Sequence, residues 1–152
     1  MIEIAELRKG DEGEWDRYVV HAPGSHFFLI SEWRNIIKKS YSHSSYYLLI
    51  RDGDEIRGVM PFIFMKSRIY GNKMVSLPYV PYGGIHSDNS TYSQHFFETL
   101  PEIRETFDLD YLELRNLNEL VFDGKADTTY DTLVLPIHPD QKFMWGMLRH
   151  TM

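Results

Sequence analysis

The spacing of apolar residues along the chain predicts alternating strands and helices. Ile2, Ile4 and Leu7 alternate with polar residues, as in a short half-buried strand. Asp11 and Glu14 have the spacing of a capping box, which predicts the start of a helix. The apolar stripe that follows has helical spacing and consists of Trp15, Tyr18, Val19 and Ala22.

A second helix and a β-hairpin are predicted next. Ser31 is the expected N-cap, and the predicted buried face of the helix consists of Trp33, Ile36, Ile37 and Tyr41. Residues 46–51 and 55–66 are the arms of a hairpin closed by an Asp-Gly-Asp turn at 52–54. The second arm is nearly all apolar, so we expect a central strand buried on both faces. Pro61 within it predicts a bulge or a local edge.

Residues 75–88 read VSLPYVPYGGIHSD, which predicts a strand that opens into a glycine loop. Val75, Leu77 and Tyr79 alternate as in a strand, and two prolines then interrupt the pattern. Gly83 and Gly84 allow a ligand to approach the backbone closely, and a helix is expected from about residue 90. Anions and acyl groups favour such junctions because the first amides of a helix are unpaired. The alternative is a tight turn with its tyrosines packed on the core.

The remaining chain predicts a helix over 91–107, a strand over 110–115 and a further strand over 132–137. Pro101 predicts a kink or a restart of that helix. A last helix begins near Pro139, and its apolar face consists of Phe143, Met144, Met147 and Leu148. We therefore expect residues 1–138 to form a single domain, and 139–152 to start a helix that leads into a missing second domain.

Composition narrows the function classes. The 152 residues suit one domain, with 43% hydrophobic and 25% charged residues. The absence of cysteine excludes disulfides, thiolate catalysis and cysteine zinc sites, and it fits a cytoplasmic protein. The formal charge of −6 argues against a broad nucleic-acid surface. No apolar run approaches the roughly 20 residues that span a bilayer.

Motifs of several common enzyme classes are absent from the sequence. It contains no Gly-x-Ser-x-Gly, no Gly-x-x-x-x-Gly-Lys, no Gly-x-Gly-x-x-Gly and no His-Glu-x-x-His. The seven histidines show no paired metal-ligand spacing, so no metal site is predicted.

Polar residues after the double glycine are the main candidates for a site. His86 and Asp88 stand where a base or an acceptor could reach a bound amine, although Asp88 could instead cap the next helix. Tyr79 and Tyr82 could wall a pocket or simply pack on the core. Arg115, beside Glu113 on one strand face, could bind a polar substrate group or form an exposed ion pair.

The order of these elements resembles the GNAT acyltransferases, an α/β (α+β) fold with a mixed, mostly antiparallel sheet flanked by helices. More specifically, the chain resembles the N-terminal half of the FemAB-type transferases, which include peptidoglycan bridge aminoacyltransferases. The residues that carry the resemblance are Phe27, Phe28, Ser31, Trp33, His43, Tyr46, Tyr47, Gly58, Pro61, Ser76-Leu77-Pro78, Tyr82-Gly83-Gly84 and Leu112-Glu113-Leu114-Arg115.

The resemblance implies acyl transfer from an aminoacyl-tRNA or a thioester such as acyl-CoA to an amine of a cell-wall precursor or a similar acceptor. It implies that the Tyr82-Gly83-Gly84 loop lines the acceptor pocket, that Asp88 and Arg115 are polar contacts, and that Lys38 contacts an acceptor phosphate. The pyrophosphate-binding pattern of the coenzyme-A-dependent members, Gln or Arg-x-x-Gly-x-Gly or Ala, is absent from the strand-to-helix junction.

Three interpretations follow from this resemblance. The first is a transferase half that binds the acceptor and that works with a C-terminal half or a second copy of the chain. The second is a non-catalytic binding module or a truncated remnant of the same fold. The third is a coenzyme-A-dependent N-acyltransferase.

Overall fold

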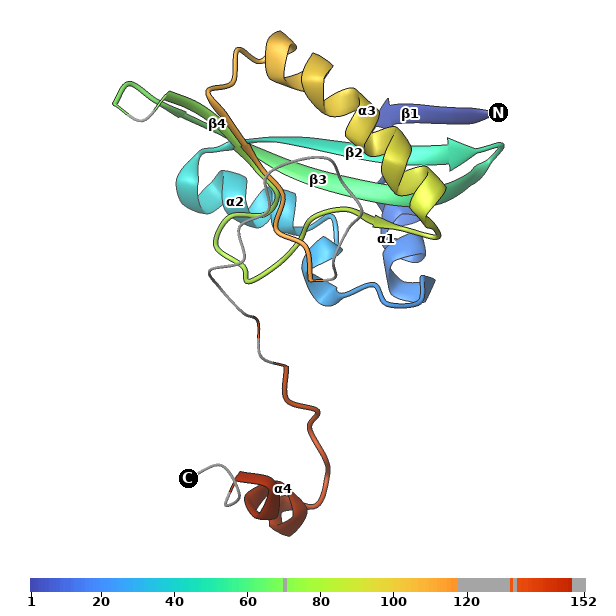
Figure 1. The fold of residues 1–152 in the computed structure, drawn as a ribbon, viewed down its shortest axis with the longest axis vertical. Helices are drawn as coiled ribbons and strands as arrows, with labels where there is room; N and C mark the ends of the chain where they lie inside the picture. The colour runs from blue at the N-terminus through green and yellow to red at the C-terminus, as the bar shows by residue number, and fades with distance from the viewer. Residues whose placement is uncertain (70, 118–131, 133, 149–152) are drawn as a thin grey trace.

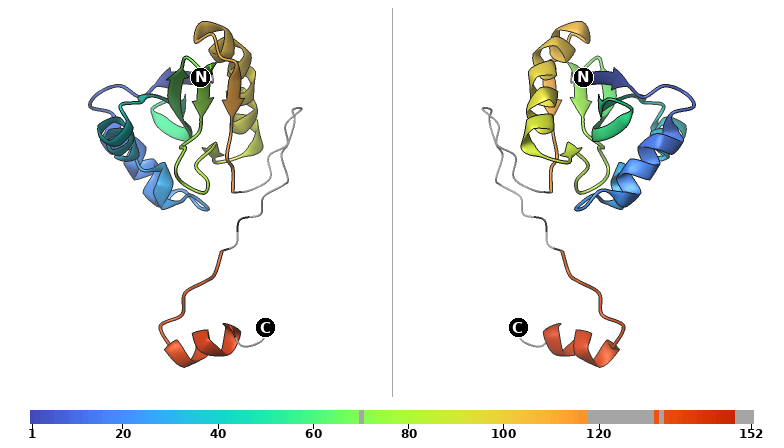
Figure 2. Two further views of the ribbon diagram at one scale, coloured as in Figure 1. Left: turned by 90° about the vertical axis from the view of Figure 1, so that its left-hand side faces the viewer. Right: turned by 90° about the vertical axis from the view of Figure 1, so that its right-hand side faces the viewer.

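A computed structural model describes residues 1–69, 71–117, 132 and 134–148. These residues form a six-stranded sheet with α1 and α2 on one face and α3 on the other, as Figures 1 and 2 show. The bounds of the elements are β1 Ile2–Glu6, α1 Glu12–His21, the 3-10 helix η1 Phe27–Leu29, α2 Trp33–Tyr41, β2 Ser44–Asp52, β3 Glu55–Ser67, β4 Gly71–Val75, β5 His86–Ser87, α3 Ser90–Thr106, β6 Tyr111–Glu113 and α4 Gln141–Leu148.

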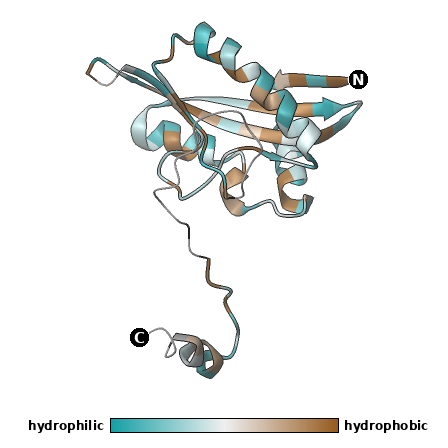
Figure 3. Ribbon diagram, in the orientation of Figure 1, coloured by the Kyte–Doolittle hydropathy of each residue, from teal (hydrophilic) through white to brown (hydrophobic). Residues whose placement is uncertain are grey.

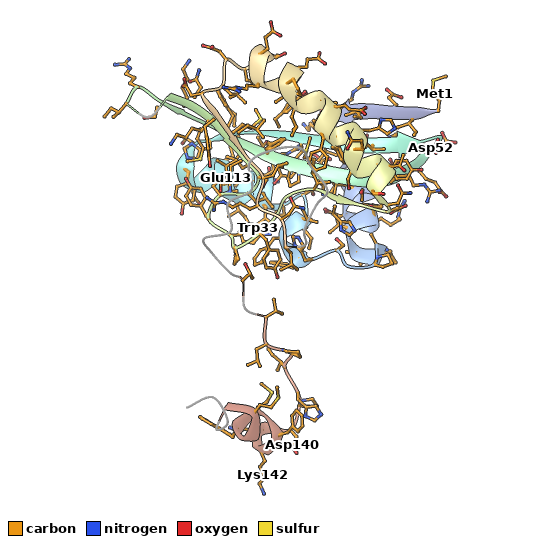
Figure 4. All side chains as sticks on the ribbon, viewed as in Figure 1. Met1, Trp33, Asp52, Glu113, Asp140 and Lys142 are labelled. Carbon is orange, nitrogen blue, oxygen red and sulfur yellow. The ribbon has the colours of Figure 1, made fainter. Side chains whose placement is uncertain are left out.

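The sheet is mixed and mostly antiparallel, as the sequence predicts. Its strand order is β1-β2-β3-β4-β6, and β5 pairs with β3 beside this path. The first four strands are antiparallel neighbours, whereas β6 runs parallel to β4 after the crossover through α3. At the free end of β1, the Met1 amino group lies 3.1 Å from the Asp52 carboxylate, and Figure 4 shows the two residues side by side.

Two apolar layers cover the two faces of the sheet, and β3 contributes to both. Val59 and Ile63 pack into the layer under α1 and α2, while Met60 and Phe62 pack into the layer under α3. All four are 0% exposed, which confirms a central strand buried on both faces. Brown, hydrophobic segments recur along the strands in Figure 3. Burying each such side chain contributes about 1.5–3 kcal/mol to stability.

The far edge of β3 is divided between two partners. β4 pairs with residues 63–67 and β5 pairs with residues 58–59, so residues 60–62 have no ladder partner on this edge. Pro61 lies in this gap, where its missing N–H removes no bond to β4 or β5. The predicted local edge is therefore present, and the register irregularity of the hairpin lies at Ile50/Arg51 instead.

Both helix starts differ from the predicted capping. Asp11 is the N-cap residue of α1, but its side chain makes no capping hydrogen bond. Glu12 instead accepts a hydrogen bond from the Gly10 amide at 2.6 Å and pairs with Arg34 at 2.8 Å. The capping-box prediction was wrong: Asp11 has a helical backbone conformation, and Glu14, the other member of the predicted box, pairs with Arg51 of β2 instead.

Ser31 does not cap α2. It is buried, and its amide and hydroxyl donate to the two carboxylate oxygens of Asp16 at 2.7 and 3.0 Å, while Glu32 is the N-cap residue. The predicted buried face of α2 is also too wide. Ile37 is 2% exposed, but Ile36 and Tyr41 are 43% and 50% exposed.

The strand predicted from Val75 to Tyr79 ends at Val75. Leu77 and Tyr79 both have left-handed backbone conformations, which no strand accommodates. The helix predicted after the loop is a single helix, α3, with Pro101 inside it and no restart. Its N-cap is Asn89, whose side chain accepts a hydrogen bond from the Tyr92 amide at 3.2 Å.

The C-terminal part lies apart from the sheet (Figure 1). The strand predicted over 132–137 is wrong for the residues described there, because 132 and 134–137 belong to no strand and are exposed. Helix α4 is present, and Figure 4 shows its Asp140 and Lys142 end remote from the sheet. Phe143, Trp145 and Met147 are 54%, 60% and 42% exposed. Residues 149–152 of the predicted helix lie outside the described residues.

Candidate functional site

The loop from Ser76 to Ile85 is anchored to the end of β6. The Ser76 amide donates to the Glu113 carbonyl at 2.9 Å, and the Ser76 hydroxyl accepts from the Arg115 amide at 2.7 Å. Ser76 is completely buried. These bonds extend the β4–β6 pairing beyond the strands and fix where the loop begins.

Two residues of this loop are held in strained conformations. Leu77 has φ 45° and Tyr79 has φ 79°, on either side of Pro78. A left-handed conformation costs a non-glycine residue roughly 1–2 kcal/mol. Leu77 is nevertheless fully buried, so core packing holds the strain in place. Strained backbone of this kind concentrates at functional sites, which directs attention to the residues that this loop presents.

The double glycine is required for close packing inside the protein. The amides of Gly83 and Gly84 both donate to the Arg115 carbonyl, at 2.8 and 2.9 Å. A Cβ on Gly83 would lie 2.4 Å from Leu77 Cδ1, and one on Gly84 would lie 1.9 Å from Asn116 Oδ1. Both glycine amides therefore point to the protein interior and are already paired.

Asn116 completes the anchoring of the loop. Its side-chain amide donates to the Ile85 carbonyl at 2.8 Å, and its Oδ1 accepts from the Ile85 amide at 3.2 Å. This pair of bonds is the one that a neighbouring strand would make. The loop therefore leaves Ile85 in a fixed position, and the next residues pair with β3 as β5.

The anchored loop delivers Asp88 to the side of the molecule that carries α1. Asp88 Oδ1 accepts a hydrogen bond from the Tyr18 hydroxyl at 2.9 Å, and Oδ2 lies 3.3 Å from Arg57 Nη1. Asp88 is thus not the helix cap, since Asn89 takes that role. Burial, followed by the neighbouring Asp88, raises the pKa of Tyr18, so its hydroxyl remains a donor at neutral pH.

Two histidines lie nearby: His86 interacts with the Asp88 carboxylate, and His26 contacts Tyr82 of the same loop. The His26 ring meets the Tyr82 ring edge-on, with centroids 4.7 Å apart, and the His86 ring lies 6.0 Å from the Tyr18 ring. Burial lowers the pKa of His26 from 6.5 to about 4, with a smaller effect from His86. Burial also lowers the pKa of His86, opposed by Asp88. Both rings are therefore neutral at pH 7.

The Nδ1 atom of His26 is buried and has no hydrogen-bond partner within the part of the chain that the structure describes. Buried polar atoms normally have a hydrogen-bond partner, so this nitrogen marks a position where a polar group of a ligand can be held. Together, Tyr18, His26, Tyr82, His86 and Asp88 form what we call the histidine cluster.

Acidification is expected to destabilise the fold through the histidine cluster. The folded protein resists protonation of His26 while the unfolded chain does not, so stability is complete above about pH 6.5 and falls as the pH drops towards 4. Urea unfolding of the His26→Phe variant should show a weaker dependence on pH between 7 and 5 than the wild type. His21→Gln, at an exposed histidine, is the control and should keep the wild-type slope. An equal slope in all three proteins would contradict this explanation.

The remaining predicted site residues lie elsewhere. Arg115 Nε donates to Glu113 Oε1 at 2.5 Å, an ion pair within one chain segment. Tyr79 stacks on Tyr41 at the end of α2, and Lys38 is exposed in the last turn of that helix. The structure thus joins Tyr82, His86 and Asp88 in one place, Gly83, Gly84 and Arg115 in the loop anchor, and Tyr79 and Lys38 near the end of α2.

Tyr18, His26 and Asn116 were not predicted as site residues. Tyr18 was assigned to an apolar stripe, and its hydroxyl had no visible partner because Asp88 is 70 residues away. No spacing signal marks His26. Asn116 directly follows the Leu-Glu-Leu-Arg segment. An asparagine at the end of a predicted strand, in a chain that also has a double-glycine loop, was the one feature of the sequence that could have indicated its role in anchoring that loop.

Other features of the described residues do not compete with this site. A hollow of about 150 Å³ on the β1 side is lined by Glu3, Ala5, Glu6, Arg8, Asp11, Leu49 and Arg51, and none of the predicted site residues lines it. Among the described residues, no group of His, Cys, Asp and Glu could hold a metal ion. No helix in these ranges is long and apolar enough to cross a bilayer.

Solved structures identify the fold. A GNAT family acetyltransferase of Staphylococcus aureus superimposes with a TM-score of 0.55 at 12% identity, over 87% of this chain and 98% of that one. A ribosomal-protein-alanine N-acetyltransferase of Brucella melitensis gives a TM-score of 0.56 at 14% identity, over 90% and 99% of the two chains. The chain has the GNAT acetyltransferase fold. A probable acetyltransferase gives a TM-score of 0.54 at 12% identity, over 90% of this chain and 99% of that one.

The GNAT fold confirms the predicted fold class. No protein-family model matches the sequence, and no curated protein matches it either. At 12–14% identity the structural likeness establishes the arrangement of strands and helices, and the chemistry has to be argued from the side chains of this chain.

Proposed function

We propose that this chain is the N-terminal, GNAT-like half of a FemAB-type transferase, and that it binds the amine acceptor of an acyl or aminoacyl transfer. The observation that carries the proposal is the histidine cluster. An anchored loop brings a carboxylate, Asp88, close to the His86 imidazole, which in turn is close to the His26 imidazole, and both imidazoles are neutral at pH 7. The acceptor is an amine of a cell-wall or polysaccharide-type precursor, and the reaction belongs to the cytoplasm, where activated acyl donors are made.

The chemistry of an amine acceptor fits these groups. An amine is an ammonium ion at neutral pH, which a carboxylate attracts, and it must lose a proton before it can attack. In our proposal the ammonium binds near Asp88, and His86 takes its proton. The amine nitrogen then bonds to the acyl carbon, the bond from that carbon to the thioester sulfur or the tRNA ester oxygen breaks, and the departing atom takes the second proton from the nitrogen. Positioning of the two reactants supplies much of the rate.

The start of α3 supports the assignment of the acyl donor to another part of the enzyme. The Asn89 side chain already occupies the Tyr92 amide, and the Asp88 carboxylate immediately precedes the helix. The pyrophosphate of coenzyme A would meet this negative charge. We therefore propose that the donor, an acyl-CoA or an aminoacyl-tRNA, is held by a C-terminal half or by a second copy of the chain. The exposed side chains Phe143, Trp145 and Met147 of α4 provide an apolar surface for that partner.

Replacement of Asp88 by alanine is expected to weaken acceptor binding at least tenfold, because a charged hydrogen bond contributes about 1.5–3 kcal/mol. The measurement is calorimetry with a peptidoglycan precursor that carries a free amine. The substitution leaves the two partners of Asp88 with other interactions. Arg57 keeps its ion pair with Glu55, and the Tyr18 hydroxyl keeps its hydrogen bond to the Arg57 carbonyl at 3.1 Å. Asp54→Ala, in the exposed hairpin turn, is the matched control and should bind as the wild type does.

The outcomes separate the three interpretations. Binding without turnover supports an acceptor-binding half or module, and turnover by the isolated chain shows that the active site is complete. A rise in melting temperature with acetyl-CoA supports a coenzyme-A-dependent N-acyltransferase and contradicts the assignment of the donor to a partner. If the wild type binds no amine-bearing precursor, or if Asp88→Ala binds it equally well, acceptor binding at the histidine cluster is wrong.

A further inference from the structure

Three aromatic side chains form a partly exposed group at the end of α2, and none of them belongs to the histidine cluster. The Tyr41 and Tyr79 rings stack with centroids 4.0 Å apart and planes 13° apart. The His43 ring is nearly parallel to Tyr79, at 5°, with centroids 6.3 Å apart. Tyr41 and Tyr79 remain 50% and 49% exposed. We call these three residues the aromatic platform.

The platform is wider than one ring. The Tyr79 hydroxyl and His43 Nε2 lie 3.0 Å apart, so these two rings meet edge to edge rather than face to face. Burial, followed by the neighbouring Tyr41, raises the pKa of Tyr79, which keeps its hydroxyl protonated as a donor to His43. Tyr41 covers one face of Tyr79, and the Tyr79 and His43 rings lie side by side in nearly parallel planes. The result is a flat surface about two rings wide.

Two residues of the segments that carry the platform have left-handed backbone conformations. Tyr79 has φ 79°, and Ser42, between the other two members, has φ 59°. Left-handed conformations of non-glycine residues are unfavourable and persist where the surrounding structure enforces them. Ser42 ends α2, with its amide donating to the Lys38 carbonyl at 3.0 Å, and Tyr79 follows the buried Leu77. Two separate segments thus have left-handed backbone next to the stacked rings.

We propose that the aromatic platform binds the apolar face of a pyranose ring. Aromatic faces carry negative charge density, and the axial C–H bonds of a sugar carry a small positive charge, so the two surfaces attract each other. The phenol hydroxyls and the ring nitrogens of His43 are hydrogen-bonding groups at the edges of these rings, which suits a ligand rich in hydroxyl groups. The chain carries a formal charge of −6, which favours an uncharged ring over a polyanion.

One part of this inference rests on the proposed function, namely the choice of an amino sugar, because the proposed acceptor is a cell-wall precursor and such precursors contain amino sugars. The probe is therefore methyl N-acetyl-β-glucosaminide, which has neither a free amine nor a phosphate. It tests the platform without engaging Asp88. Asp88→Ala should bind this sugar as the wild type does.

The experiment is saturation-transfer NMR on the whole chain, with affinity taken from a titration of the tyrosine signals. In the wild type, transfer should be strongest to the ring C–H protons of the sugar. Tyr41→Ala and Tyr79→Asn should each weaken binding about tenfold, as expected for the loss of one stacking contact. Asparagine is chosen because it tolerates the left-handed backbone at residue 79. Tyr111→Ala, at a tyrosine of equal exposure on β6, is the control and should bind normally.

The proposal is overturned if the wild type shows no transfer, if both platform variants bind unchanged, or if uridine receives stronger transfer to its base than the sugar does to its ring. Loss of sugar binding with intact binding of the amine-bearing precursor would refute the platform alone. The reverse result would refute acceptor binding at the histidine cluster and leave the platform standing.

Discussion

Gly84→Ala is expected to lower the free energy of unfolding by about 3 kcal/mol, within the range of severe single substitutions. The added Cβ would lie 1.9 Å from Asn116 Oδ1 and 3.1 Å from the Arg115 carbonyl oxygen. Asn116 cannot move away without breaking both of its hydrogen bonds to Ile85. Urea unfolding followed by circular dichroism measures the effect.

A matched glycine gives the control. A Cβ on Gly13, in the first turn of α1, would meet no atom within 4 Å, so Gly13→Ala should leave stability unchanged or raise it by up to about 1 kcal/mol. Asn116→Ala removes the clashing amide, and the double variant should therefore lose less stability than the two single variants added together. Strict additivity would show that the contact between Gly84 and Asn116 is not the cause.

Trp15→Ala is expected to cost about 4 kcal/mol of stability, as large-to-small changes of buried aromatic residues do. Trp15 is 0% exposed, its ring centroid lies 5.2 Å from that of Tyr47, and its Nε1 donates to the Leu29 carbonyl at 2.7 Å. The variant leaves a cavity and also an unpaired carbonyl in η1. Since η1 follows His26 directly, the histidine cluster should loosen as well.

Trp145→Ala is the natural comparison, because Trp145 is 60% exposed on α4. Its removal should change the stability of the domain by less than about 0.5 kcal/mol. Thermal unfolding of both variants distinguishes a core tryptophan from a surface one. An equal loss from the two substitutions would mean that α4 belongs to the cooperative unit of the sheet.

The sequence predicted best those elements whose partners are near in the chain. The β2–β3 hairpin follows from two apolar arms and an Asp-Gly-Asp turn, and its arms are adjacent. The nearly continuous apolar run in β3 predicted that this strand is buried on both faces. Helix α3 was also predicted to within a residue at each end, because its apolar spacing is regular.

Side-chain bonds to distant segments account for several wrong predictions. Ser31 has the right identity and place for an N-cap, yet Asp16 is within reach and takes both of its donors. Leu77 continues the alternation of a strand, but anchoring of Ser76 to the end of β6 forces the chain into a left-handed turn. Local propensity was outweighed by tertiary contacts in both cases.

The residues of the candidate site were predicted only in part, for the same reason. His86 and Asp88 stand beside a recognisable double glycine, so the sequence pointed to them. Their partners Tyr18 and His26 belong to a segment more than 50 residues earlier, and only the folded sheet brings them together. Gly83 and Gly84 are needed because Leu77 and Asn116 pack directly against them. The sequence alone cannot distinguish this packing role from a role in admitting a ligand.

The parallel pairing of β6 with β4 also bears on the order of folding. The β1–β4 ladder grows mostly from neighbouring segments, and such local contacts close quickly. The β4–β6 contact must wait for α3 to cross over, and the hydrogen bonds that anchor Ser76, Gly83, Gly84 and Ile85 of the loop are made to residues 113–116, at the far side of that crossover. A nascent chain that ends before Asn116 would therefore carry a preformed hairpin without a fixed loop, and the histidine cluster would assemble in the last stage of folding.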